Sequence, residues 1–187
     1  MKKKILQTNS VHLTLMTILI LFVQLGSRAQ PSWPTPDPSN IALFKPAKQI
    51  NTFEAGHANR AVDGNTDGHW HRGSVSHTNG SQNPWWEVNL LEEFDISSIT
   101  VYNRTDCCPD RLKNFSIRVS PQPFEGNYGG EVFNNEGAIF SNSKTFTNAI
   151  RGQYVRIYME DPGILSLAEV VVNGTPVNPE RILKKDE

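Results

Sequence analysis

The spacing of apolar residues constrains the fold of this chain more than any other feature. No segment between residues 40 and 174 repeats its apolar residues with a convincing helical period of 3.6. Residues 99–104 and 153–159 instead alternate between apolar and polar side chains. That alternation is the pattern of strands that bury one face, because successive side chains of a strand point to opposite sides.

Short apolar segments of this kind predict six strands in the chain. They cover residues 85–90, 96–104, 115–119, 144–147, 153–159 and 167–173. Short strands joined by long polar loops are typical of a β-sandwich or jelly roll. We therefore expect a single all-β domain with a jelly-roll β-sandwich fold, whose function lies on the loops at one end.

The first 29 of the 187 residues are predicted to be a signal peptide. Three lysines at positions 2–4 precede an apolar stretch from about Val11 to Leu25, and Ser27 and Ala29 supply the small residues of a cleavage site. A membrane anchor is the alternative, but the stretch is short for a span and is interrupted by polar residues. We therefore expect a secreted protein, extracellular or periplasmic, without membrane insertion.

The remaining chain divides into three parts. Residues 30–39 hold four prolines and are predicted to be an extended leader, residues 40–174 form the domain, and residues 175–187 are a C-terminal tail. Loss of the signal peptide removes four of the 18 basic residues, which leaves 14 against 19 acidic residues, a net charge of −5. Nucleic-acid binding needs a basic surface, so we expect no nucleic-acid partner.

The chain has two cysteines, Cys107 and Cys108, which are adjacent. Cysteines of exported proteins tend to be paired. Neighbouring Cα atoms are only about 3.8 Å apart, below the usual ~4.4–6.8 Å across a bridge, so a bond between them would close a small ring and present a rigid apolar plate. Two free thiols, or bridges to another copy of the chain, are the alternatives, and the cysteines alone favour the bridges between copies.

Charged and aromatic neighbours change that interpretation. Arg104, Asp106 and Arg111 flank the cysteines, and His77 stands 26 residues before Arg104. Two guanidiniums held by an acid form a fixed fork of donors, and a neutral histidine adds one directional donor or acceptor. Taken singly, each residue is more simply a surface ion pair or a surface histidine, but together they suit a small ligand with clustered hydroxyls and one methyl.

These four residues resemble the signature of the F-type lectin (fucolectin) family, H-x26-R-x-D-x4-[RK], with every spacing intact. The likeness covers roughly residues 40–174. The stretch NPWWEVNL at 83–90 resembles the family's strand before the motif, and RAVDGNTDGHW at 60–70 resembles its metal loop.

The resemblance implies a non-enzymatic lectin that recognises terminal α-L-fucose on fucosylated glycans. The fucose-binding residues would be His77, Arg104, Asp106, Arg111, Cys107, Cys108, Trp70 and His71. The histidine at position 77 and the two arginines would hydrogen-bond sugar hydroxyls and the ring oxygen, and the acid would hold the arginines in position. A disulfide between the adjacent cysteines would pack on the sugar ring, while Trp70 and His71 would shape a pocket for the C6 methyl.

The resemblance also implies a bound Ca²⁺ with a structural role. Its ligands would be the side chains of Asp63, Asn65, Ser74 and Glu169 and the backbone carbonyls of Arg60 and Ala168. Such hard oxygen donors suit Ca²⁺, and the ion would fix the loop 60–77. Without the resemblance, the stretch DGNTDG predicts only a common turn.

Two other functions are compatible with the sequence. Four histidines, His57, His69, His71 and His77, lie within 21 residues, and two of them could hold a zinc ion of a metalloenzyme, although no hydrolase spacing accompanies them. The second is a structural or adhesive β-sandwich that binds protein or lipid, since a fold does not settle function. Because one monosaccharide site binds weakly, we also expect a homo-oligomer or a partner that clusters the domain.

Overall fold

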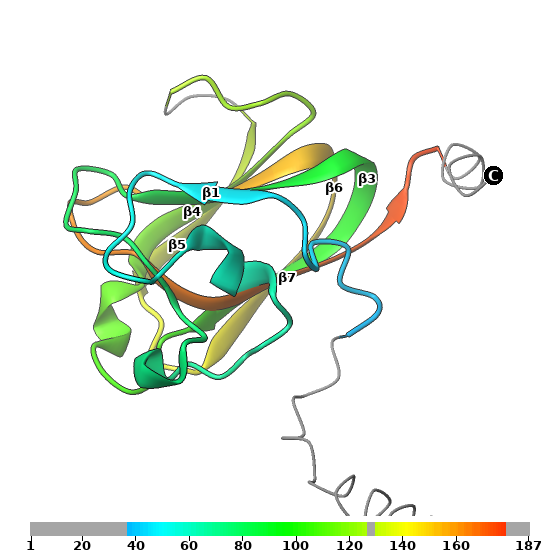
Figure 1. Cartoon of the computed structure of the whole chain (residues 1–187). Helices are drawn as coiled ribbons and strands as arrows, with labels where there is room; N and C mark the ends of the chain where they lie inside the picture. Colours follow the sequence, from blue (N-terminus) through cyan, green and yellow to red (C-terminus); the bar gives the residue numbers. More distant parts are fainter. Residues whose placement is uncertain (1–36, 127–129, 179–187) are drawn as a thin grey trace, which may run out of the picture. The chain divides into compact units, whose positions relative to one another are not determined.

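A computed structural model describes residues 37–126 and 130–178 of the chain (Figure 1). The predicted signal peptide (1–29), the leader up to residue 36 and the tail from residue 179 lie outside the described residues. Within the described part, no helix has both the length and the apolar character needed to cross a membrane.

Seven strands and three short 3₁₀ helices make up the described domain. The strands are β1 (Ala47–Gln49), β2 (Ser76–His77), β3 (Trp85–Asn103), β4 (Lys113–Ser120), β5 (Glu131–Ala138), β6 (Ser143–Met159) and β7 (Ser166–Pro176). The 3₁₀ helices are η1 (Ala58–Val62), η2 (Trp70–Arg72) and η3 (Pro109–Arg111). All strand pairings are antiparallel, which confirms the predicted all-β class.

The two longest strands, β3 and β6, each run through two layers (Figure 1). The first part of β3 pairs with β1 and with the last part of β6, which continues to β4 and β5. The second part of β3 pairs with the first part of β6 and with β7, which continues to β2. Register shifts between Asn89 and Phe94 and between Ile96 and Ser98 mark the transition. Strands that change layer at such irregularities build a sandwich around one core.

The predicted strands match observed ones, except that segment 96–104 extends one residue past the end of β3. Two pairs of predicted strands are continuous, because 85–90 and 96–103 both belong to β3, and 144–147 and 153–159 both belong to β6. The continuity was not predicted because irregular segments inside these strands interrupt the alternation of apolar and polar residues. The hydrogen-bonded pairing of β3 with β6 nevertheless continues past them. The short strands β1 and β2 and the strand β5 were not predicted.

The core lies between the layers and is lined by inward-facing residues of both. It includes Trp86 and Val88 of β3, and the fully buried Trp86 donates its indole N–H to the carbonyl of Ala58 at 2.8 Å. This bond fastens η1 to the sheet, so the loop that follows η1 starts from a fixed position. The alternation predicted for 99–104 is present, since Ile99 and Val101 are buried while the side chains between them are half-buried.

A buried ion pair covers the outer face of the β3–β6 pairing. Arg156 is 2% exposed and Glu87 1% exposed, and two guanidinium nitrogens donate to one carboxylate oxygen at 2.9 and 2.6 Å. Arg156 also donates to the carbonyl of Gly126 and lies 4.5 Å from the ring centroids of Trp85 and Phe124. The loop that contains Phe124 therefore closes over this face, which explains why the polar side of segment 153–159 is buried.

Replacement of Arg156 by methionine is expected to lower the free energy of unfolding by about 3–5 kcal/mol, because it leaves the Glu87 carboxylate buried with only the exposed Lys48 as a cationic partner. Urea denaturation measures this. The control is Arg151→Met, which breaks a bidentate pair with Asp95 on the surface and should cost no more than about 1 kcal/mol. Equal losses in the two variants would contradict the importance of burial.

Candidate functional site

The loop after η1 and the loop after β3 are joined by hydrogen bonds at one end of the domain. The backbone N–H of Thr105 donates to the carbonyl of Gly68 at 2.8 Å, and the backbone N–H of Trp70 donates to the carboxylate of Asp106 at 3.2 Å. Gly68 is required for this approach, because a Cβ there would lie 2.6 Å from the carbonyl oxygen of Asn103. The sequence-predicted residues of both loops therefore meet.

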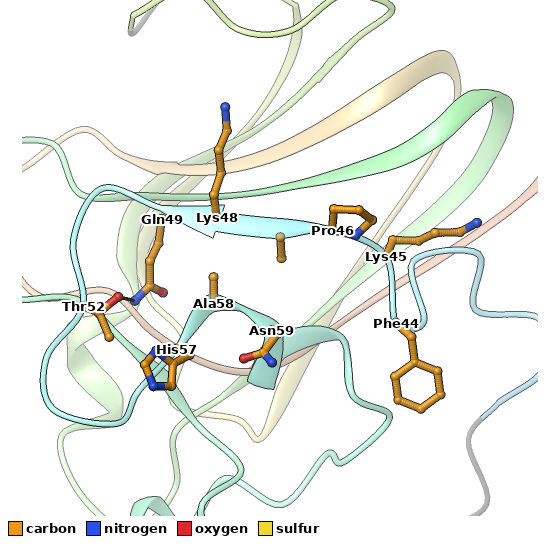
Figure 2. A pocket seen from close by; sticks show the side chains of 10 residues that line it. Phe44, Lys45, Pro46, Lys48, Gln49, Thr52, His57, Ala58 and Asn59 are labelled. Atoms are coloured by element: carbon orange, nitrogen blue, oxygen red, sulfur yellow. Dashed lines mark hydrogen bonds between the residues drawn. The ribbon is translucent and has the colours of Figure 1, made fainter.

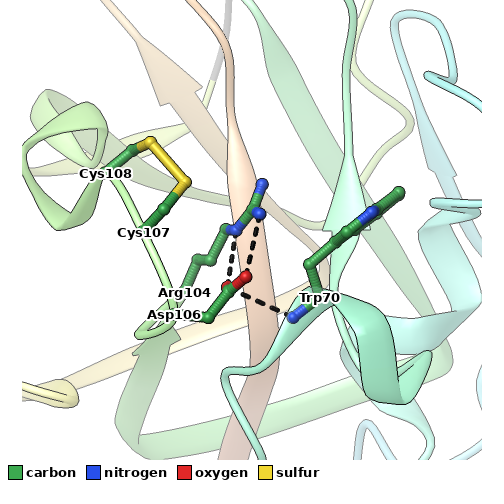
Figure 3. Close-up of a disulfide and its surroundings, with 5 residues drawn as sticks. All are labelled: Trp70, Arg104, Asp106, Cys107 and Cys108. Carbon is green, nitrogen blue, oxygen red and sulfur yellow. Dashed lines mark hydrogen bonds and ion pairs between the residues drawn. A yellow bond between two sulfur atoms is a disulfide. The ribbon is translucent and has the colours of Figure 1, made fainter.

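Arg104 and Asp106 form a bidentate ion pair at the centre of this group (Figure 3). Their atoms lie 2.8 and 3.1 Å apart, and each side chain is 10% exposed. The hydrogen bonds from Arg104 hold the pKa of Asp106 well below its usual range, with a further contribution from the Trp70 N–H. Asp106 is thus a permanent acceptor that orients the guanidinium and is unsuited to proton transfer.

The surroundings of His77 favour the neutral imidazole and one of its two tautomers. Its exposed fraction is 5%, and burial lowers its pKa, with the positive charges of Arg104 and Arg111 adding to the effect. Nδ1 lies 2.8 Å from the carbonyl oxygen of Thr78. Since a carbonyl only accepts, Nδ1 carries the proton and Nε2 presents a lone pair. His77 therefore offers an acceptor beside two arginines that can only donate.

Trp70 lies close to both His77 and Arg104. Its ring centroid is 5.1 Å from that of His77 in an edge arrangement, and the guanidinium carbon of Arg104 lies 5.5 Å from the ring. Figure 3 shows Arg104 and Asp106 between the disulfide on one side and Trp70 on the other. The predicted aromatic neighbour is therefore in contact with both predicted polar groups.

Phe53 is an aromatic residue of this site that sequence reasoning missed. Its ring centroid lies 4.9 Å from that of His77 and 6.2 Å from that of Trp70. A tight turn over residues 53–56 holds it there, because Phe53 N–H donates to His77 O and His77 N–H donates to Gly56 O, both at 2.9 Å. A Cβ on Gly56 would lie 2.7 Å from that of His77. No motif marks this turn, so one sequence carries no signal for it.

The adjacent cysteines are bonded to each other, which excludes free thiols and bridges between copies as alternatives for this structure. Cys108 has a left-handed backbone, with φ of 55°, and is the N-cap residue that precedes the short helix η3. The N–H of Arg111 donates to the carbonyl of Cys108 at 3.1 Å. The disulfide thus adjoins the turn that places Arg111, which is half-buried.

His71 is less firmly placed in the site than the other predicted residues. It is exposed, and its ring lies 6.0 Å from that of His69. Within the described residues no group of three or more histidine, cysteine, aspartate or glutamate side chains is arranged to hold a metal ion. The four histidines therefore give no support to the zinc-enzyme alternative.

A groove of about 680 Å³ runs beside β1, and none of the predicted fucose-binding residues lines it (Figure 2). Its lining consists of residues 44–49, Thr52 and residues 57–59. His57 is the one sequence-predicted candidate in this lining. Figure 2 shows Lys48 directed away from the groove, toward its ion pair with Glu87.

Two carboxylates of the predicted cation site, Asp63 and Glu169, are close enough for their charges to interact. Glu169 is fully buried; one of its oxygens accepts from Gly64 N–H at 3.2 Å, and the other has no hydrogen-bond partner. Burial and the charge of Asp63 raise the pKa of Glu169 to about 8, and burial also raises the pKa of Asp63. An unsatisfied oxygen beside a second carboxylate is the chemistry that a bound cation relieves, so these two residues fit a Ca²⁺ ion.

The other predicted ligands are placed near the loop but are engaged elsewhere. The side-chain oxygen of Asn65 accepts from Asp67 N–H at 3.1 Å, and the hydroxyl of Ser74 donates to the carbonyls of Asp67 and His69. Ala168 is fully buried beside Glu169, and Arg60 is half-buried with its guanidinium 5.5 Å from the Trp70 ring. Their coordination of a cation stays a prediction.

The chain is similar in sequence or structure to several known proteins, and their names agree with one another. Residues 60–157 match a family model described as a NedA-like, galactose-binding domain. Fucolectin-4 of Anguilla japonica is 34% identical over 176 residues, which cover 87% of this chain and 98% of the relative. A fucose-binding module of Streptococcus pneumoniae, SpX-3, is 35% identical with a TM-score of 0.66, covering 72% of this chain and 96% of the module. The lectin domain of Lectinolysin complexed with Lewis B antigen is 31% identical with a TM-score of 0.68, covering 74% and 99%.

In the absence of a cation, the protein is expected to lose stability as the pH rises from about 4.5 to about 8. In this window folded Glu169 retains a proton that the unfolded chain has released, because its pKa rises from 4.5 to about 8 on folding. The folded state binds more protons, so the free energy of unfolding falls with pH. Urea denaturation in EDTA at a series of pH values measures the slope.

The variant Glu169→Gln should flatten this slope, since it removes the titrating group. Glu136→Gln is the control, because Glu136 is exposed, and it should keep the slope of the unmodified protein. A slope that is the same in all three proteins would show that Glu169 does not titrate in this way.

Proposed function

This chain belongs to the F-type lectin (fucolectin) family, and on that premise we propose that the loops around His77 bind terminal α-L-fucose on glycans in a calcium-dependent manner. The relatives are lectins and binding modules by name, in agreement with the expectation of a non-enzymatic protein. The permanently ionised Asp106 also suits orientation rather than proton transfer.

The main support for this proposal is that one hydrogen-bond acceptor, Nε2 of His77, lies near two cationic donors, Arg104 and Arg111. A hydroxyl has one hydrogen and two lone pairs, so it can donate to Nε2 of His77 while it accepts from Arg104 and Arg111. A carboxylate or phosphate ligand has no hydrogen to give to Nε2 and would leave that lone pair unsatisfied. The site therefore favours a neutral polyol over an anion, although it contains two arginines.

Selectivity among sugars follows from the rigidity of these groups. Asp106 fixes Arg104, and Thr78 fixes the ring of His77, so neither can turn toward a hydroxyl of the wrong stereochemistry. A sugar that lacks an axial hydroxyl in the right place would leave buried polar atoms unpaired, which costs about 1–3 kcal/mol for each group. Such a site discriminates between epimers more sharply than an apolar pocket does.

Apolar groups complete the site on both sides of the polar cluster. The Cys107–Cys108 disulfide adjoins Asp106, and the rings of Trp70 and Phe53 pack around His77. We assign the rings to the C6 methyl and the disulfide to the edge of the sugar ring. We also assign the exposed His71 to the rim of the methyl pocket.

The calcium part of the proposal is supported by the unsatisfied oxygen of Glu169 and its proximity to Asp63. A cation there would neutralise the buried Glu169 and the half-buried Asp63, and it would stabilise the segment between Gly64 and Ser74, which includes Trp70. Asn65, Ser74 and the carbonyls of Arg60 and Ala168 would complete the shell. The same proposal includes export of the protein by the predicted signal peptide. It also includes either self-association or a partner that clusters the domain.

Replacement of Arg104 by alanine is expected to weaken L-fucose binding by about 100-fold or more, since it removes a charged donor that is worth about 1.5–3 kcal/mol for each hydrogen bond. Isothermal titration calorimetry measures this. Arg151→Ala is the matched control, because Arg151 makes the same bidentate pair with Asp95 on the exposed surface, and its affinity should not change. Unaltered affinity in Arg104→Ala would refute the assignment.

Addition of Ca²⁺ to the EDTA-treated protein is expected to raise its melting temperature, because a ligand that binds only the folded state stabilises it by mass action. Differential scanning calorimetry in EDTA and in excess Ca²⁺ measures the shift. Glu169→Gln should lose most of the shift, whereas Glu136→Gln should retain it. If Ca²⁺ left the melting temperature of the unmodified protein unchanged, the calcium proposal would be wrong.

A further inference from the structure

The hydroxyl of Ser166 is buried without a hydrogen-bond partner. Ser166 is the first residue of β7 and is 3% exposed, and within the part of the chain that the structure describes no group bonds to its Oγ. A buried hydroxyl in this state has lost its bonds to water and gained none from the protein, so it lowers stability. Such groups are rare in folded proteins, and each one needs an explanation.

The register of the sheet places Ser166 beside His77. The two residues lie directly opposite each other on β7 and β2, and opposite residues of an antiparallel pair direct their side chains to the same face. No backbone hydrogen bonds join them, because the backbone of His77 is bonded to Phe53 and Gly56 on its other side. The side chains of such a pair lie closer together than those of a hydrogen-bonded pair.

Ser166 faces the proposed fucose site and not the core. The leucines that precede and follow it belong to the hydrophobic core, so its own side chain points the opposite way. Strand β7 lies between β2 and β3 in the sheet. On the β3 side, Leu167 pairs with Asn103, the last residue of that strand, and Arg104 follows directly. The Ser166 hydroxyl is therefore flanked by the strand that holds His77 and by the strand that leads to Arg104.

A hydroxyl at this position complements the neighbouring polar groups. Nε2 of His77 accepts a hydrogen bond, whereas Arg104 can only donate. A serine hydroxyl can do both at once, as can a hydroxyl of a sugar. A sugar hydroxyl bound beside His77 would thus supply the partner that the protein does not give to Ser166.

We propose that Ser166 is a further sugar-binding residue, whose Oγ forms a hydrogen bond with one ring hydroxyl of the bound fucose. This inference rests on the proposed fucose site and adds to it a residue that the signature of four spaced residues does not include. The free protein contains an unsatisfied group that the ligand satisfies. Ser166 should therefore improve binding while it lowers the stability of the free protein, a combination that binding sites often show.

Replacement of Ser166 by alanine is expected to change affinity and stability in opposite directions. Binding of methyl α-L-fucopyranoside should weaken by about two- to tenfold, which corresponds to one neutral hydrogen bond. The midpoint of urea denaturation should stay the same or rise, because the variant removes a buried group without a partner. Isothermal titration calorimetry and urea denaturation measure the two quantities.

Ser76→Ala is the matched control. Ser76 is 2% exposed and precedes His77 in β2, but it lies opposite Leu167 on the core side, and its hydroxyl donates to the carbonyl of Leu167 at 3.1 Å. This variant removes a satisfied hydroxyl that is remote from the ligand. It should therefore lower the midpoint of urea denaturation and leave the affinity for methyl α-L-fucopyranoside unchanged.

The 2-, 3- and 4-deoxy analogues of methyl α-L-fucopyranoside identify the sugar hydroxyl that Ser166 contacts. In Ser166→Ala, the loss of affinity on removal of one of these hydroxyls should be about two- to tenfold smaller than in the unmodified protein. Unchanged affinity of Ser166→Ala would overturn the inference. Weaker binding together with lower stability, or equal losses for all three analogues in the two proteins, would overturn it as well. If the unmodified protein did not bind methyl α-L-fucopyranoside, the proposed function itself would be refuted.

Discussion

The bidentate pair of Arg104 and Asp106 is the interaction on which the site depends. It does two things at once, because the same carboxylate oxygen that receives Arg104 Nε also receives the backbone N–H of Trp70. The loop after β3 is thereby bound to the loop after η1. The polar Arg104 and the apolar Trp70 are therefore held by the same oxygen of Asp106. An ion pair that only oriented the guanidinium would not position Trp70.

The class of fold and the polar centre of the site could be predicted from sequence, for different physical reasons. The alternation of apolar and polar side chains in segments such as 99–104 shows that one face of each strand is buried. A β-sandwich could therefore be predicted from it. The polar centre was predicted from a fixed spacing that resembles a family signature, namely that of His77, Arg104, Asp106 and Arg111. The continuity of β3 and β6 could not be predicted, because bends between Asn89 and Phe94 resemble turns in a single sequence.

Phe53 shows why part of the site was beyond sequence reasoning. Its position depends on a turn closed by backbone hydrogen bonds to His77 and on a glycine at position 56 whose missing Cβ allows Trp70 to approach. Backbone hydrogen bonds have no residue signature, and a glycine is common in loops of many kinds. The requirement for glycine becomes visible only when the atom that would occupy its Cβ position is known.

The two halves of the proposed binding surface differ in what their formation requires. The Arg104 half is fixed by the protein alone, since Arg104 is paired with Asp106 and the imidazole of His77 is hydrogen-bonded. Strand β7, beneath the loop 60–77, contains the buried carboxylate oxygen of Glu169 without a partner, and such a group lowers stability unless a proton or a cation satisfies it. We infer that pairing with protein groups fixes the polar centre, while the supporting loop depends on solution conditions. A ligand that contacts both Trp70 and Arg104 would then bind most tightly when the loop is also satisfied, which couples cation binding to sugar binding without direct contact between them.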